Sequence, residues 1–234
     1  MSAREGLPRV FDSVDVWLER AVEQLGAACG LPASAVAEVK AGATPAARTV
    51  AGGAVAYLDR LDASRLCVLY TSLAAEAKVT AYVHAMRPGY RDTLDRLSVP
   101  ERWTLAPQLL SGANPFPPGS RIHEHLVRLF ALRDELGRAW PRPMGAADPV
   151  DGGMGVRFAP NVARELLESV ARGAKKLGEL YEHQRGSSIV FALRATEALA
   201  GAAAAAAALP APTLAELEEE ERAAAGFAEE LIGA

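Results

Sequence analysis

An arginine on the apolar face of a predicted helix is the residue with the clearest chemical potential. When residues 121–140 are spaced at about 100° each, the large apolar side chains form one stripe: Ile122, Leu126, Leu129, Leu136 and Trp140. Arg133 falls inside this stripe. Because a guanidinium keeps its charge in proteins, its burial is costly unless a partner compensates it. We therefore expect Arg133 either to form a structural ion pair or to belong to a binding site or subunit interface.

Glu76 is the predicted partner of Arg133. It lies on a predicted helix over 64–86 that is apolar over most of its surface, and its neighbours on that helix are uncharged: Leu69, Thr80 and Val83. An acid and a base on two apolar faces stabilise each other where the faces meet. We therefore predict a Glu76–Arg133 ion pair that brings these two helices side by side.

The four histidines show no spacing that is typical of a metal site or of nucleophilic catalysis. His84 shares a helix face with apolar residues, so we interpret it as a core or rim histidine and keep it as a binding candidate. His123 and His125 lie two positions apart on a predicted helix and therefore point to different faces. The glycines of 152–155 lack the Lys-Ser/Thr of a phosphate-binding loop. No metal and no cofactor are expected.

The elements that position these residues are predicted to be helices. Apolar residues recur at helical spacing, and no segment alternates with a period of two. We therefore predict an all-α fold, an antiparallel helical bundle with a C-terminal helical extension. The expected helices cover about 13–29, 34–41, 45–62, 64–86, 121–140, 160–184 and 188–208. A turn or two of helix is expected within 91–110, where Pro100 and Pro107 interrupt it, and Ser64 and Ser120 are the candidate N-caps.

Charge divides the chain of 234 residues into a body and a tail. Residues 213–234 contain seven Glu and one Arg, so this segment carries −6 while residues 1–212 carry +2. We predict a bundle over 1–186 and an extension over 187–234, which holds an alanine-rich helix, a hinge at Pro210 and Pro212, and an acidic helix. Residues 189–209 are the only membrane candidate, and Arg194 and Glu197 interrupt it, so no membrane association is expected. Cys29 and Cys67 are interpreted as buried free thiols of a reducing cytoplasm.

Three segments, taken in order, resemble parts of HEPN domains, an all-helical nucleotide- and RNA-binding superfamily. Residues 72–83 (SLAAEAKVTAYV) resemble the acidic helix of the family, and residues 97–110 (LSVPERWTLAPQLL) resemble a Trp-containing connection of some members. Residues 126–136 (LVRLFALRDEL) resemble the helix with the Arg-Asn/Asp signature, which would fall on Arg133 and Asp134. The resemblance covers a core of about 64–184.

The departure from the family lies after Arg133. Ribonuclease members place a histidine beyond the arginine, with four to six residues between the two. Here Arg133-Asp134 is followed by Glu-Leu-Gly-Arg-Ala-Trp, and none of the four histidines has an arginine five to seven positions before it. Because a positioned acid–base group contributes about 10²–10⁴ in rate, its loss argues against catalysis. Arg133, Asp134 and Glu76 are therefore candidates by their match to positions of the family, but the catalytic activity of the family is not expected of them.

Three functions remain open on the sequence. The first is a non-catalytic HEPN-like binding protein of a bacterial toxin–antitoxin or defence system, which binds RNA, a nucleotide, a cognate protein or a second copy. The resemblance implies a homodimer in which the Arg133 helices face each other. The second is an RNA-cleaving HEPN-type ribonuclease with an unconventional base, His84 or His125. The third is a structural scaffold whose acidic C-terminal helix binds a protein partner.

Overall fold

The computed structural model of the chain describes residues 10–31, 36, 54–86, 90–139, 157–185 and 189–209. All regular structure in these ranges is helical: α1 (Val10–Ala28), α3 (Ala54–Met86), α4 (Arg91–Leu94), α5 (Val99–Ser111), α6 (Arg121–Ala139), α8 (Pro160–Arg185) and α9 (Ile189–Ala208). The helices pack against one another as a bundle, so the predicted all-α fold is confirmed.

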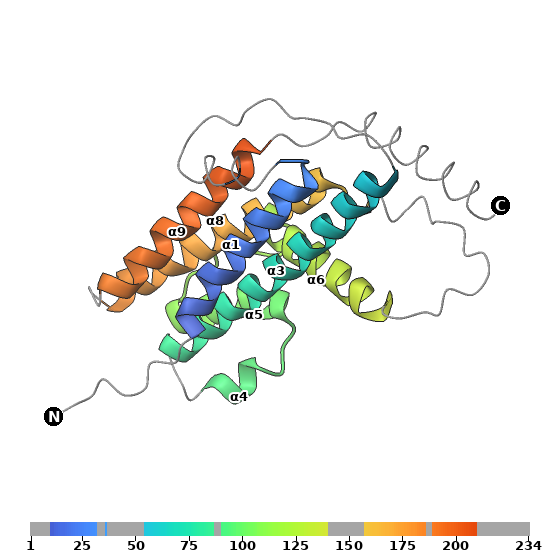
Figure 1. Ribbon diagram of the computed structural model, residues 1–234. Helices are drawn as coiled ribbons and strands as arrows, with labels where there is room; N and C mark the ends of the chain where they lie inside the picture. Colours follow the sequence, from blue (N-terminus) through green and yellow to red (C-terminus); the bar gives the residue numbers. More distant parts are fainter. Residues whose placement is uncertain are drawn as a thin grey trace.

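Four long helices form the body of the bundle. In Figure 1, α1 and α3 lie side by side and run in opposite directions, and α8 and α9 form a second antiparallel pair. Helices α5 and α6 pack against both α3 and α8, whereas α4 stands at the periphery near one end of α3. A single cluster of buried apolar side chains draws on α1, α3, α5, α6, α8 and α9. The sites on α5 and α6 are therefore held against a four-helix support.

Helix α3 is longer than predicted. A boundary was expected near residue 63, with Ser64 as the N-cap of a new helix, but one helix runs through from Ala54 to Met86 and Ser64 lies fully buried inside it. Ser64 was thus wrongly interpreted as a cap. Neither glycine nor proline occurs between residues 54 and 86, so nothing in the backbone breaks the helix there.

Helix α5 is also longer and more regular than predicted. Its first turn is closed by a capping box: the backbone N–H and the hydroxyl of Ser98 donate to the Glu101 carboxylate, and the Glu101 N–H donates to Ser98 Oγ. Pro100 occupies the first turn, where the missing N–H costs nothing. Pro107 lies inside the helix without ending it, because the buried Trp103 holds α5 against the core.

The remaining predictions about the elements have mixed outcomes. The caps and bounds of α6 agree with expectation, since Ser120 Oγ accepts from the His123 N–H. Helices α8 and α9 coincide with the predicted 160–184 and 188–208 within two residues. The predicted helix over 34–41, except Val36, and the acidic helix after 213 lie outside the described residues.

The C-terminal end of the described chain is part of the core. Helix α9 packs against α8 and α1, and its buried residues Leu199, Ala205 and Ala206 join the cluster, as does Leu209. Cys29 and Cys67 are both fully buried free thiols, as expected. Burial raises the pKa of Cys67 to about 12, so this thiol is unreactive at neutral pH.

Candidate functional site

The predicted ion pair between Glu76 and Arg133 is present. Arg133 Nη1 of α6 donates to Glu76 Oε2 of α3 at 3.1 Å. The Glu76 side chain is 40% exposed and that of Arg133 is 32% exposed, so the pair lies at the rim of the core rather than inside it. The geometric expectation drawn from two apolar helix faces is therefore confirmed.

A second arginine, which the sequence reading did not single out, binds the same carboxylate. Arg102 Nη2 of α5 donates to Glu76 Oε1 at 3.4 Å, and Nη1 donates to Thr80 Oγ1 at 3.2 Å. Nη1 also lies 3.5 Å from Asp95 Oδ1. The Arg102 side chain is only 9% exposed, which makes it the most buried charge of the cluster. We call Glu76, Arg102, Arg133, Asp95 and Asp134 the junction cluster.

Trp103 explains how Arg102 reaches Glu76. The indole N–H of Trp103 donates to the carbonyl oxygen of Ala75 at 3.0 Å, and the ring is fully buried against Phe116. Because Ala75 precedes Glu76, this bond fixes α5 beside the turn of α3 that carries the carboxylate. The residue before Trp103 then lies over Glu76 and Thr80. The sequence did contain a signal for this role, because Arg102 precedes a tryptophan within the Trp-containing segment 97–110.

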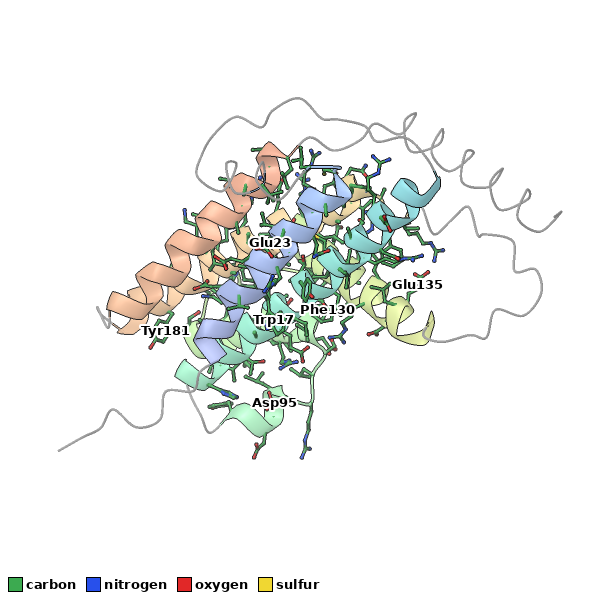
Figure 2. All side chains as sticks on the ribbon, viewed as in Figure 1. Trp17, Glu23, Asp95, Phe130, Glu135 and Tyr181 are labelled. Carbon is green, nitrogen blue, oxygen red and sulfur yellow. The ribbon has the colours of Figure 1, made fainter. Side chains whose placement is uncertain are left out.

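Arg133 has two further partners on its own helix. Its Nη2 donates to Asp134 Oδ1 at 3.3 Å. Its guanidinium carbon lies 4.5 Å from the centre of the Phe130 ring, within the range of a cation–π interaction. Figure 2 labels Phe130 on α6, which packs against α3, and Asp95 next to α4. The Arg133 guanidinium thus has two carboxylate partners and one aromatic ring beside it.

The junction cluster contains two guanidinium groups and three carboxylates, so its formal charge is −1. Glu76 is shared by both arginines, and each arginine has a second carboxylate of its own. Such an arrangement joins three helices through charge-assisted hydrogen bonds. It leaves little attraction for a phosphate, because the carboxylates already neutralise the arginines.

His84 does not join the junction cluster through any hydrogen bond. It is half-buried on α3, two turns beyond Glu76, which corresponds to about 12 Å along the helix axis. Arg102, bound to Thr80, occupies the turn between them. The Nε2 atom of His84 is buried and makes no hydrogen bond. The structure therefore places His84 at the rim, beside the core.

His125 lies away from Arg133 and has its own partner. Its Nδ1 is 2.6 Å from Ser169 Oγ of α8, so this contact ties α6 to α8. His125 and Arg133 are eight residues apart on α6, which again separates them by about 12 Å along the axis. Across the part of the chain that the structure describes, no group of three metal-ligating side chains was found.

No helix within the described ranges is both long enough and apolar enough to cross a membrane. Comparison of the chain with protein families, with curated proteins and with solved structures found no match. The junction cluster is therefore interpreted from its own geometry.

Proposed function

We propose that this chain is a non-catalytic helical binding protein of HEPN-like type, which acts through contact with a protein partner. The observation that carries this proposal is the neutralised state of Arg133. Its guanidinium is bound by Glu76 and Asp134 and covered by Phe130. An arginine that stabilises a phosphate in a reaction needs donors that are free to face the substrate. Here one donor joins α6 to α3 through Glu76, and another binds Asp134 on the same helix.

The second support is the placement of the histidines that a ribonuclease would need. His84 and His125 each lie about two helical turns from the residues of the Glu76–Arg133 pair along their own helices. His125 is bonded to Ser169 on another helix. A general base must come within hydrogen-bond reach of the proton that it removes. These positions favour binding over RNA cleavage, which is the alternative function.

The family assignment and the toxin–antitoxin or defence role rest on the sequence resemblance alone. The cytoplasmic location rests on the interpretation of Cys29 and Cys67 as free thiols of a reducing compartment. RNA or a nucleotide is the alternative partner to a protein. The apolar residues exposed on α1, α3, α5 and α6 favour the protein partner: Val16, Leu66, Leu105 and Val127.

The test is an RNA incubation with two matched variants. Wild type, Arg133→Ala and Leu109→Ala are incubated with mixed RNA, and both cleavage products and bound RNA are measured. We expect no cleavage above the Arg133→Ala background and no RNA retention. Cleavage by wild type and Leu109→Ala that disappears in Arg133→Ala would establish the ribonuclease instead.

A further inference from the structure

A strip of exposed cations follows the contact between α6 and α8. The contact is marked by His125 Nδ1 of α6, which lies 2.6 Å from Ser169 Oγ of α8. On α6, Arg121 and Arg128 are four residues before and three residues after His125, so they share its face. On α8, the positions three, six and seven residues beyond Ser169 are also exposed and cationic. We call these five residues the α6–α8 strip: Arg121, Arg128, Arg172, Lys175 and Lys176.

Most of the charge on the α6–α8 strip is not paired. Arg121, Arg128 and Lys176 form no ion pair with any other residue that the structure describes. The other two members pair only with a carboxylate one turn away on α8: Arg172 with Glu168 at 3.1 Å and Lys175 with Glu179 at 3.9 Å. Exposed pairs of this kind contribute little free energy and exchange readily with other partners. The strip is therefore open to an anion from elsewhere.

The two helices of the strip are also the cationic helices of the described bundle. Helix α6 has four cations and three carboxylates, and α8 has five cations and four carboxylates, so each carries +1. Helix α1 carries −3, and the other described helices, α3, α4, α5 and α9, are neutral. An acidic segment is therefore attracted to α6 and α8 more than to any other described helix.

The acidic end of the chain begins beside this strip. Arg164 Nη1 of α8 donates to the carbonyl oxygen of Leu209 at 3.3 Å, and Leu209 is buried in the core. Only residues 210–212 separate Leu209 from the segment 213–234, whose charge is −6. Three extended residues span about 10 Å, which matches the distance of about 8–10 Å between packed helices.

The length of the segment suits the strip. From Arg164 to Lys176, α8 rises by about 18 Å. Residues 213–221 span about 14 Å as the predicted acidic helix, and the linker adds about 10 Å. The five glutamates at 216 and 218–221 thus come within reach of every cation of the strip.

We propose that residues 213–234 dock on the α6–α8 strip of their own chain, with the glutamates of 216–221 facing its cations. The inference goes beyond the proposed function and does not depend on it. A segment tethered by a short linker has an effective concentration in the millimolar range, so individually weak charge pairs suffice. The docked segment covers these cations against other polyanions, whereas the exposed Val16 and Leu66 lie on other helices and stay accessible.

Two other occupants carry the same kind of charge. The segment 213–234 of a second copy has the same sequence, and a nucleic acid has a denser charge. Neither is held at Leu209, so neither has the advantage of the tether. The experiment separates all three occupants.

The experiment is zero-length cross-linking of the full chain with a carbodiimide, which joins a lysine amine to a carboxylate. The chain has only four lysines: Lys40, Lys78, Lys175 and Lys176. Lys78 is 5% exposed and should not react. We expect Lys175 and Lys176 to be joined to residues 216–221, and this product is counted by mass spectrometry relative to the Lys175–Glu179 product. Raising the salt from about 0.05 M to about 1 M should lower it about five-fold or more, because the Debye length falls to about 3 Å.

Two matched double variants keep the reporting lysines and remove equal charge. Arg121→Gln/Arg128→Gln should lower the product with residues 216–221 by about three-fold or more. Arg20→Gln/Arg96→Gln, at exposed positions away from α6 and α8, should leave it unchanged. Circular dichroism checks that each variant is folded, and the salt series on wild type tests the proposal without any variant.

The isotope content of the products identifies the occupant. In a mixture of ¹⁴N- and ¹⁵N-labelled chains, docking within one chain gives products of a single label, and these support the proposal. Mixed-label products in equal amount would assign the strip to the segment of a second copy. Products at Lys40 as abundant as those at Lys175 and Lys176, or equal losses in the two double variants, would overturn the proposal. No product with residues 216–221 at low salt would leave the strip to a foreign polyanion and would overturn it as well.

Discussion

At the scale of single residues, Glu76 of α3 links its own helix to α5 and α6. One carboxylate binds an arginine from α5 through one oxygen and an arginine from α6 through the other. The more buried of these is Arg102, whose other partners are Thr80 and Asp95. Loss of the Glu76 charge would therefore leave a mostly buried guanidinium with less compensation than it has now.

We expect Glu76→Gln to destabilise the fold by about 1–3 kcal/mol, which is below the value for a fully buried pair because water screens a side chain that is 40% exposed. Urea unfolding measures this difference. Arg133→Met should cost less, about 0.5–1 kcal/mol, since Arg133 is a third exposed. Glu19→Gln, on the exposed side of α1, serves as the control. Equal stability of Glu76→Gln and Glu19→Gln would show that the charge of Glu76 in the junction cluster contributes nothing to the free energy of unfolding.

The same residues show what a sequence can predict about a site. Glu76 and Arg133 were predictable as partners because each is a charge on an apolar helix face, and such charges require compensation. Arg102 was missed because its burial depends on the bond from Trp103 to Ala75, a contact 28 positions apart in the chain. Helical periodicity carries no information about such a contact.

At the scale of the elements, close packing sets the position of α5 against α8. A Cβ atom placed on Gly173 of α8 would lie 2.8 Å from the Trp103 ring and 3.3 Å from Ile122. Only glycine leaves room there for the indole that positions Arg102. Gly137 of α6, by contrast, has nothing within 4 Å of such an atom.

We expect Gly173→Ala to lower the free energy of unfolding by about 1–3 kcal/mol, because overpacking against Trp103 outweighs the gain in helix propensity. Gly137→Ala should raise it by about 0.4–1 kcal/mol, since that site gains propensity without a clash. Thermal and urea unfolding of the two variants measure the contrast. Stabilisation by both substitutions would mean that the Trp103 ring shifts at little cost.

The capping box of α5 predicts a dependence on pH. The hydrogen bonds from the hydroxyl and then from the backbone N–H of Ser98 lower the pKa of Glu101. A pKa that is lower in the folded chain means that ionised Glu101 stabilises the fold above its ordinary pKa. This contribution disappears as the pH falls through the lowered value.

Glu101→Gln should therefore be less stable than wild type at neutral pH, and the two should converge in acid, as the pH falls below the lowered pKa of Glu101. Urea titrations at neutral pH and in acid give the comparison. Glu124→Gln, an exposed change in the first turn of α6, is the control for the general effect of removing a negative charge. A difference between Glu101→Gln and wild type that persists undiminished in acid would contradict the role of the carboxylate in the cap.

Element boundaries were less predictable than element types. Ser64 is a residue type that often caps helices. The helix nevertheless continues through it, because Ser64 and its neighbours Ala63 and Cys67 are buried against the rest of the bundle. Pro107 has the residue type of a helix breaker, yet α5 continues because Trp103 and Ala106 are buried beside it. Local signals were overridden at both places by contacts that only the folded chain supplies.

At the scale of the whole molecule, the position of α9 decides how many units unfold together. The division of the chain into 1–186 and 187–234 treats the alanine-rich helix as an appendage, and it stays a prediction. Leu199, fully buried between α9 and the rest of the bundle, allows a direct test.

We expect Leu199→Ala to lower the free energy of unfolding by about 2–5 kcal/mol, the range for a fully buried leucine, and to do so in one cooperative transition. Leu25→Ala in α1 provides the matched comparison, because its side chain is equally buried. Calorimetry and circular dichroism should give coincident transitions for both. A main transition that Leu199→Ala leaves unmoved would show that α9 folds independently.

Helix α3, with 33 residues, is about 50 Å long and packs against α1, α4, α5, α6 and α8. A segment with so many neighbours cannot open locally without exposing most of the core. Amide hydrogens in its middle should therefore exchange with deuterium only through global unfolding, while those of α4 exchange through local fraying. The slowest exchange rates along α3 would then report the stability of the entire bundle.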